Sequence, residues 1–164
     1  MLAIRRIFAL ALAGLALVAT LAPAAESTLT KVVDLAADAA SARKIDVPLL
    51  ILYSLAGCPH CEAIRRGHLT PLAAEIPLKA IIRQIDLQSA VPMRGFDGKA
   101  ISHDDFARAQ GIKFAPVVVF YNADGKRLGE ALVGSMLPDY YGVYLADGLT
   151  AAAQAMRQQQ TKLP

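Results

Sequence analysis

Residues 49–62 constrain the fold of this chain more than any other stretch. They begin with an apolar run rich in Leu and Ile, which is typical of a buried strand, and Gly57 ends that run. Cys58 and Cys61 follow, and they are the only two cysteines in the 164 residues. Pro59 suits the first position of a helix, so we expect Cys58 at the helix N-terminus and Cys61 one turn inside. Residues three apart are neighbours on a helix, at a separation that allows a disulfide.

The predicted position of each cysteine suggests its chemical role. At a helix N-terminus the free N–H groups and the helix dipole stabilise an anion, so the pKa of Cys58 should lie below that of a free thiol. We therefore predict Cys58 as the nucleophile in thiol–disulfide exchange, and the shielded Cys61 as the thiol that resolves the mixed disulfide. His60, when protonated, would place a further positive charge beside the Cys58 thiolate.

The succession of strand, Cys-x-x-Cys and helix resembles the thioredoxin superfamily, and the intervening pair Pro59-His60 is the one found in the DsbA family of periplasmic disulfide oxidants. Two further motifs match. Ala115-Pro116 stands where the superfamily places its cis-proline, and an Asp-Gly pair at 124–125 stands at its final hairpin. The resemblance implies that Pro116 packs beside the cysteines and that the backbone of Ala115 pairs with the substrate chain.

The hydrophobic pattern predicts the remaining elements in the thioredoxin order. The first half contains a helix over 30–44 capped by Thr30, the strand that begins at 49, a helix over 59–66 with a second piece over 72–76, and a strand over 79–87. A loop over 89–101, in which Asp97-Gly98 closes a small hairpin, leads to a helix over 102–110 and a strand over 112–121. A turn at 122–126, a returning strand over 127–133, a last helix opened by Pro138 and a frayed tail over 158–164 complete the chain. The resemblance implies an α/β thioredoxin fold, with a central mixed β-sheet flanked by helices and an extra N-terminal helix.

Two departures separate this chain from parts of the superfamily. Many thioredoxin-fold oxidoreductases carry a buried acid six residues before the first cysteine, which assists proton transfer at the second, and here that position is Leu52. DsbA carries a large helical insertion, and no stretch of this chain could supply one. The chain therefore looks more like the small periplasmic thioredoxins than like DsbA.

The first residues have the pattern of an export signal. Two arginines precede an uncharged apolar segment over 7–21, and Ala22-Pro23-Ala24 offers a signal-peptidase site. We expect residues 1–24 to be a signal peptide and 25–164 to be a thioredoxin-like domain delivered to the periplasm. The alternative is an uncleaved membrane anchor, although the apolar segment is shorter than the roughly 20 residues of a comfortable span.

The charge balance argues against a nucleic-acid partner. The chain has 17 Lys and Arg residues against 14 Asp and Glu residues, and removal of the leader with its two arginines leaves 15 against 14. The sequence contains no long run of Lys or Arg, so we expect no nucleic acid among the partners.

Two other uses of the cysteine pair stay open. A Cu(I) site with two thiolate ligands, as in a copper chaperone, is chemically reasonable. A purely structural disulfide is also possible, but it would close so short a loop that it would stabilise the fold little. The remaining histidines, His68 and His103, are expected at the surface or in capping positions.

The sequence thus predicts an exported thiol–disulfide oxidoreductase that exchanges disulfides with protein substrates, in a direction that the sequence leaves open. The expected site residues are Cys58, Pro59, His60 and Cys61 for catalysis, and Ala115 and Pro116 for substrate contact. The redox centre is the cysteine pair itself, without a bound cofactor or metal. We expect a periplasmic or membrane redox partner, and no membrane span after signal cleavage.

Overall fold

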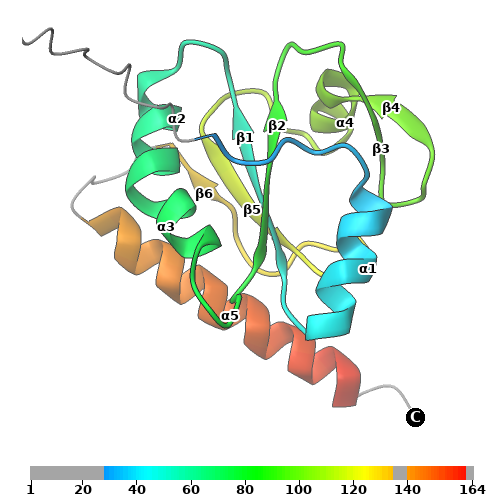
Figure 1. Cartoon of the computed structure of the whole chain (residues 1–164), viewed down its shortest axis with the longest axis vertical. Coiled ribbons are helices and arrows are strands. Elements are labelled where there is room, and N and C mark those ends of the chain that lie inside the picture. The colour runs from blue at the N-terminus through cyan, green and yellow to red at the C-terminus, as the bar shows by residue number, and fades with distance from the viewer. Residues whose placement is uncertain (1–27, 135–139, 162–164) are drawn as a thin grey trace, which may run out of the picture.

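The structure, a computed structural model, describes residues 28–134 and 140–161. Its central strand is β1 (Leu49–Ser54), in which every residue is buried. β1 pairs in parallel with β2 (Ile81–Asp86) and antiparallel with β5 (Val117–Tyr121). Because β1 has a neighbour on both edges and is covered on both faces, it lies at the centre of the fold (Figure 1).

The sheet continues on both sides of these strands. β6 (Leu132–Val133) pairs antiparallel with β5, so the strand order is β2, β1, β5, β6. The returning strand expected over 127–133 is thus shorter than predicted, with a single bridge between Tyr121 and Arg127 at its start. Beyond β2, the lead at residues 30–32 runs alongside the sheet as a further extended edge, where it bridges to Gln84.

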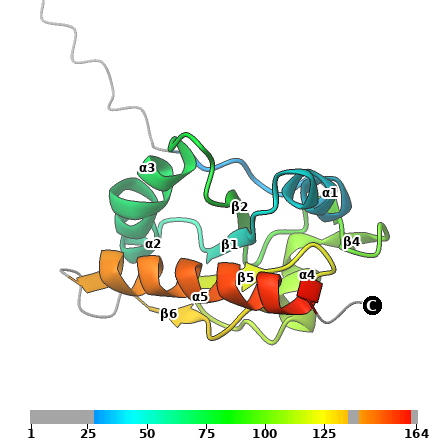
Figure 2. The ribbon, with the colours of Figure 1, turned by 90° about the horizontal axis from the view of Figure 1, so that it is seen from below.

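Residues alternate along β1 between two apolar layers. Its odd-numbered residues pack with α1 (Leu35–Ile45) and α4 (His103–Ala109), and its even-numbered residues pack with α2 (Pro59–Ile64), α3 (Thr70–Ala73) and α5 (Tyr141–Thr161). Figures 1 and 2 show the strands between these two groups of helices, with α5 crossing the lower part of the molecule in Figure 1. The mixed sheet flanked by helices, with α1 ahead of the first strand of the sheet, confirms the predicted architecture.

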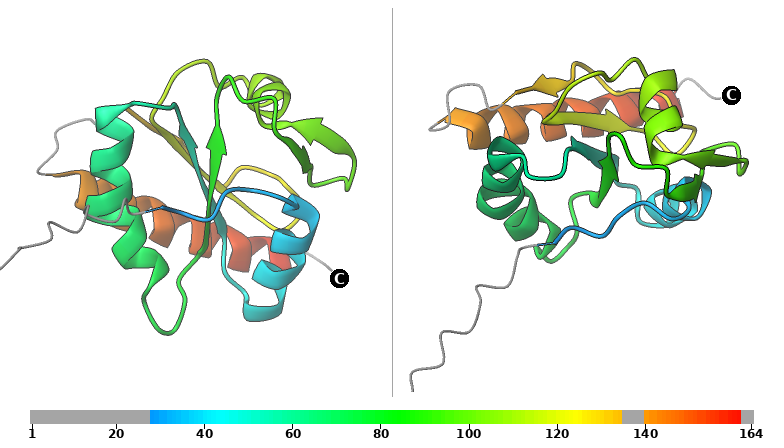
Figure 3. Two further views of the ribbon diagram at one scale, coloured as in Figure 1. Left: turned by 45° about the horizontal axis from the view of Figure 1, so that its top comes forward. Right: turned by 90° about the horizontal axis from the view of Figure 1, so that it is seen from above.

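The N-terminal helix begins later than the sequence predicts. The N–H of Val32 donates to the carbonyl of Gln84 at 2.9 Å, and the N–H of Gln84 donates to the carbonyl of Thr30 at 3.0 Å, so this segment is extended. The prediction that Thr30 caps the helix is therefore wrong. Asp34 is the cap, and its carboxylate accepts the N–H of Ala37 at 2.9 Å. Figure 3 shows the lead passing along β2 before α1 starts.

The helix after the cysteines is continuous where the sequence predicts a break. A π-helical turn over Arg65–Leu69 joins α2 to α3, and the N–H of Thr70 donates back to the carbonyl of Arg65 across it. Gly67 lies inside this turn, and Pro71, which has no N–H to donate, lies in the first turn of α3 directly after it. The wider turn therefore accommodates both residues without ending the helix. Within the described ranges, no helix has the length and apolar character needed to cross a bilayer.

Two further segments are more ordered than expected. The loop over 89–101 contains the hairpin of β3 (Pro92–Arg94) and β4 (Ala100–Ser102), which turns at the predicted Asp97-Gly98 pair. α5 extends to Thr161 through the predicted frayed tail. The amide of Asn122 donates to Gln159 at 2.9 Å there, and this long-range contact ties the helix end to the sheet. Pro138 and the proposed signal peptide lie outside the described residues.

The close approach of α5 to β5 gives a test of this packing. A Cβ added at Gly148 would lie 2.8 Å from the ring of Phe120, which is buried in the core. Alanine favours a helix interior over glycine by about 1 kcal/mol, but here overpacking should dominate. We expect Gly148→Ala to lower the free energy of unfolding by about 1–3 kcal/mol, measured by chemical denaturation.

Gly142→Ala in the same helix is the matched control. Its added Cβ would meet only the ring of His68, at 3.6 Å, which is an ordinary contact. This variant should be neutral or gain up to about 1 kcal/mol from helix propensity. Equal stabilisation by both substitutions would contradict the packing of Gly148 against Phe120.

Candidate active site

The two cysteines lie at the start of α2, directly after the turn that follows β1. Gly57 in the connecting turn has a φ of 68°, a conformation that glycine adopts without strain. Cys58 is the N-cap of α2, and its sulfur accepts the N–H of Cys61 at 3.1 Å. The two residues form a disulfide with 5.3 Å between their Cα atoms. The predicted positions of Cys58, Cys61 and Pro59 at the start of the helix are thus confirmed.

The two sulfur-bearing residues differ in accessibility. Cys61 is fully buried, whereas Cys58 is partly exposed and lines a groove at the surface. A thiol-reactive molecule arriving from solvent can therefore reach Cys58 more readily than Cys61. His60 is exposed in the first turn of α2, between the two cysteines in sequence.

The segment before β5 reaches the same end of the sheet as the cysteine turn. Tyr53 of β1 pairs with Val117 of β5, so Pro116 lies next to the end of β1, from which the chain leads to Cys58. The Ala115–Pro116 peptide bond is cis, as the resemblance implied. Pro116 is buried and Ala115 is partly exposed.

The position of the superfamily's buried acid is filled by an apolar residue. Leu52 is fully buried and packs in the layer that contains Ile64 of α2 and Leu69 of the π turn. It pairs with Val118 of β5 and with Gln84 of β2, so neither strand neighbour places a charge at this position. Any electrostatic help for Cys61 must therefore come from outside β1.

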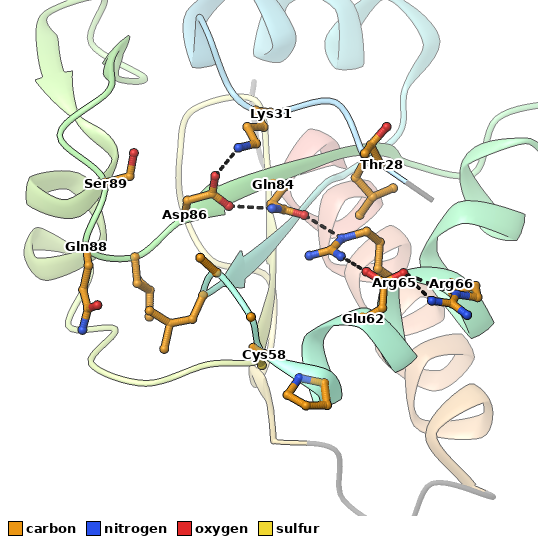
Figure 4. Close-up of a pocket in the computed structure, with 16 residues that line it drawn as sticks. Thr28, Lys31, Cys58, Glu62, Arg65, Arg66, Gln84, Asp86, Gln88 and Ser89 are labelled. Carbon is orange, nitrogen blue, oxygen red and sulfur yellow. Dashed lines mark hydrogen bonds and ion pairs between the residues drawn. The ribbon is translucent and has the colours of Figure 1, made fainter. Parts of the chain in front are cut away.

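A charged cluster supplies the polar side of the site (Figure 4). The guanidinium of Arg65 donates to Gln84 Oε1 at 2.9 Å and to Ser54 Oγ at 3.1 Å, and it forms a close ion pair with Glu62. From Gln84 the network continues through Asp86, whose carboxylate accepts the Gln84 amide, to an ion pair with Lys31 at 2.6 Å. These side chains come from α2, the π turn, β1, β2 and the lead.

The cluster lines the groove that also holds Cys58. The groove has a volume of about 790 Å³ and runs from the β1–α2 turn past α2 to the end of β2 and the lead. The Arg66 guanidinium contacts the same Glu62 carboxylate from the exposed side, at 2.9 Å. Two guanidinium groups thus share one carboxylate next to the disulfide.

The two carboxylates of this groove are held in their ionised forms. The hydrogen bond from Arg66, reinforced by Arg65, lowers the pKa of Glu62. Burial would raise the pKa of Asp86, but hydrogen bonds from Lys31 and Gln84 outweigh it, so the pKa of Asp86 is lowered. A lowered pKa makes a carboxylate a weaker base, so neither group is suited to accept a proton from a thiol.

This cluster was not identified from the sequence. The spacing of Cys61 and Arg65, four residues apart on a helix, was a usable signal for a shared helix face. Gln84 and Asp86 gave no such signal, because only strand pairing brings β2 beside α2.

The other two histidines lie away from the disulfide. His68 packs its ring against Tyr141, with 5.1 Å between the ring centroids. His103 is buried, against the expectation of a surface position, because both ring nitrogens are used in the fold. Its Nδ1 accepts the N–H of Asp86 at 3.1 Å, and its Nε2 lies 2.9 Å from the carbonyl of Val32. No group of three or more metal-ligating side chains occurs in the part of the chain that the structure describes.

The fold and the disulfide at a helix N-terminus define a thioredoxin-fold protein with a redox-type cysteine pair. A family model described as a thioredoxin-like domain matches residues 35–148, and the chain belongs to this family. No curated protein sequence matches the chain.

Two solved structures show the same fold at low sequence identity. The oxidised C-terminal domain of Neisseria meningitidis DsbD is 17% identical with a TM-score of 0.51, over 73% of this chain and 99% of that domain. A DsbH oxidoreductase is 12% identical with a TM-score of 0.51, over 81% of this chain and 90% of the other.

The difference in accessibility predicts which thiol reacts first. After reduction, iodoacetamide should modify Cys58 well before Cys61, because Cys58 is partly exposed at a helix N-terminus whereas Cys61 is buried. Peptide mapping of briefly treated protein measures the order. The control is Cys58→Ser, in which serine keeps the N-cap and the single remaining thiol should react slowly. Faster labelling of Cys61 would reverse the assignment.

Proposed function

We propose that this protein is an exported thiol–disulfide oxidoreductase that exchanges disulfides with protein substrates through Cys58 and Cys61. The observation that carries the proposal is the pairing of a partly exposed sulfur at the N-cap of α2 with a buried one a single turn away. The thioredoxin-like domain and the redox-type cysteine pair support thiol–disulfide exchange in general.

The proposed exchange proceeds in two displacement steps. In the reducing direction, the Cys58 thiolate attacks a client disulfide, forming a mixed disulfide and releasing one client thiolate, which takes a proton from solvent. The Cys61 thiolate then attacks the Cys58 sulfur, the bond to the client breaks, and the second client thiol leaves. The client gains two electrons and the cysteine pair is oxidised to the disulfide. The oxidising direction is the reverse.

The surrounding residues have supporting roles in this proposal. Pro59 starts the helix whose N–H groups face the Cys58 sulfur, and His60 adds positive charge when protonated. The client chain lies against Ala115 and Pro116, at the same sheet edge as the disulfide. The reaction uses no cofactor or metal, takes place in the periplasm after removal of residues 1–24, and draws on a periplasmic or membrane redox partner.

Trapping a mixed disulfide tests the function directly. Cys61→Ser should still attack clients through Cys58 but should be unable to release them, because the resolving thiol is gone. Expressed in the native compartment, this variant should accumulate disulfide-linked complexes that disappear on reduction. Cys58→Ser is the matched control and should accumulate none. Absence of complexes in both variants would contradict the proposal that the protein acts on protein substrates.

The environment of Cys58 also predicts its redox poise. The helix N-terminus and His60 stabilise the thiolate and hence the reduced pair, which makes the disulfide a stronger oxidant. We expect a Cys58 pKa below the free value of about 8.5 and a potential less negative than the roughly −270 mV of thioredoxin. Equilibration with glutathione measures the potential, with His60→Pro as the comparison. A potential at or below that of thioredoxin, unchanged in this variant, would disprove the prediction.

A further inference from the structure

The exchange reaction requires an anion at a place where the fold disfavours one. Cys61 must be a thiolate to attack the mixed disulfide, yet its side chain is fully buried. Burial disfavours the charged form of a thiol. Leu52, on the face of β1 toward α2, supplies no polar group to offset this cost. A compensating charge must therefore lie on another element near Cys61.

Arg65 is placed to supply that charge. It follows Cys61 by four residues in a helical segment, so the two side chains project from neighbouring positions on one face. Its guanidinium is only 14% exposed and is held toward β1 by the hydrogen bond to Ser54. Ser54 lies two residues beyond Leu52 on the same strand, and alternate residues of a strand point to the same face. The guanidinium thus occupies the space between α2 and the end of β1.

The charges around Arg65 leave a positive excess. Glu62 is its ion-pair partner, but the same carboxylate also contacts Arg66, so one negative charge is shared by two positive ones. The third contact, Gln84, is neutral. An arginine in a partly buried site keeps its charge at every physiological pH and is screened less than an exposed one.

We propose that Arg65 is a positioning residue that stabilises the thiolate of Cys61 and thereby speeds resolution of the mixed disulfide. This inference rests on the proposed function. In the step concerned, the Cys61 thiolate forms the bond to Cys58, the bond between Cys58 and the client breaks, and the client thiolate leaves and is protonated by solvent. Arg65 transfers no proton and contributes through its fixed charge.

The other charged groups of the groove fit this division of roles. Glu62 and Asp86 are held ionised by their cationic partners and oppose a nearby thiolate. Lys31 is paired with Asp86 at the far side of Gln84, and the Arg66 side chain is 68% exposed, so its charge is more strongly screened than that of Arg65. His60 is exposed in the first turn of α2, and its proposed role is at Cys58.

The test measures ionisation of Cys61 as a single thiol. In a Cys58→Ser background, the ultraviolet absorbance of the thiolate is followed as a function of pH. Adding Arg65→Gln should move the titration to higher pH and lower the thiolate fraction at neutral pH about threefold or more. Arg65→Lys should restore part of the effect because it keeps the charge, although not the planar hydrogen-bonding geometry.

Two further variants separate an electrostatic role from a structural one. Glu62→Gln removes the carboxylate that offsets Arg65, so it should move the titration to lower pH, opposite to Arg65→Gln. Arg66 contacts the same carboxylate from the exposed side, so Arg66→Gln should change the titration less than Arg65→Gln. If Arg65→Gln does not fold, Arg65→Lys takes its place, and its titration should lie at higher pH than that of the protein with Arg65. Shifts of the same sign in the Arg65→Gln and Glu62→Gln variants, or no shift in a folded Arg65→Gln variant, would overturn the proposal.

The outcome is independent of whether clients are found. The titration needs no substrate. If the wild-type protein exchanges disulfides but Arg65→Gln leaves the Cys61 titration unchanged, only the inference about Arg65 is wrong. If the wild-type protein does not equilibrate with glutathione and the Cys61→Ser variant forms no mixed disulfides, the proposed function itself is wrong.

Discussion

The structure depends on β1, which is paired on both edges and covered on both faces. A strand with hydrogen bonds to β2 and β5, and with separate apolar layers above and below it, has little freedom to shift in register. The turn that carries Cys58 begins directly where this strand ends. The disulfide is therefore attached to the most constrained part of the molecule, and its neighbours are determined by which segments reach the same end of the sheet.

Three segments meet there for different physical reasons. The end of β2 arrives because β1 and β2 are parallel, and Pro116 arrives because β5 is antiparallel and starts where β1 stops. α2 begins there because Cys58 caps it with its own sulfur and Pro59 has no N–H to satisfy. The same sulfur thus serves as a helix cap and as the exposed half of the redox pair.

The site separates an apolar side from a charged side. Leu52 and the layer around it keep water from the inner face of the cysteine helix, while Arg65, Gln84 and Asp86 form a hydrogen-bonded chain along its outer edge. A buried sulfur between two such surfaces is sensitive to a single fixed charge, because the surrounding medium screens it weakly. The position of Arg65 is therefore expected to have a strong influence on the ionisation of Cys61.

The sequence by itself determined the position of the cysteine motif and the order of strands and helices, because these follow from local composition and short spacings. The cis bond at Pro116 was implied by the resemblance to the thioredoxin superfamily. The sequence misjudged the lead at Thr30, where pairing with the distant β2 overrides the local helical pattern. It anticipated the hairpin turn at Asp97-Gly98 but not the strands β3 and β4 on either side of it. Only the tertiary structure decided that Gln84 and Asp86 join Arg65 beside the disulfide, and that the ring nitrogens of His103 are taken up by backbone groups. Those contacts join residues far apart in the chain, and strand register, which local sequence does not encode, brings them together.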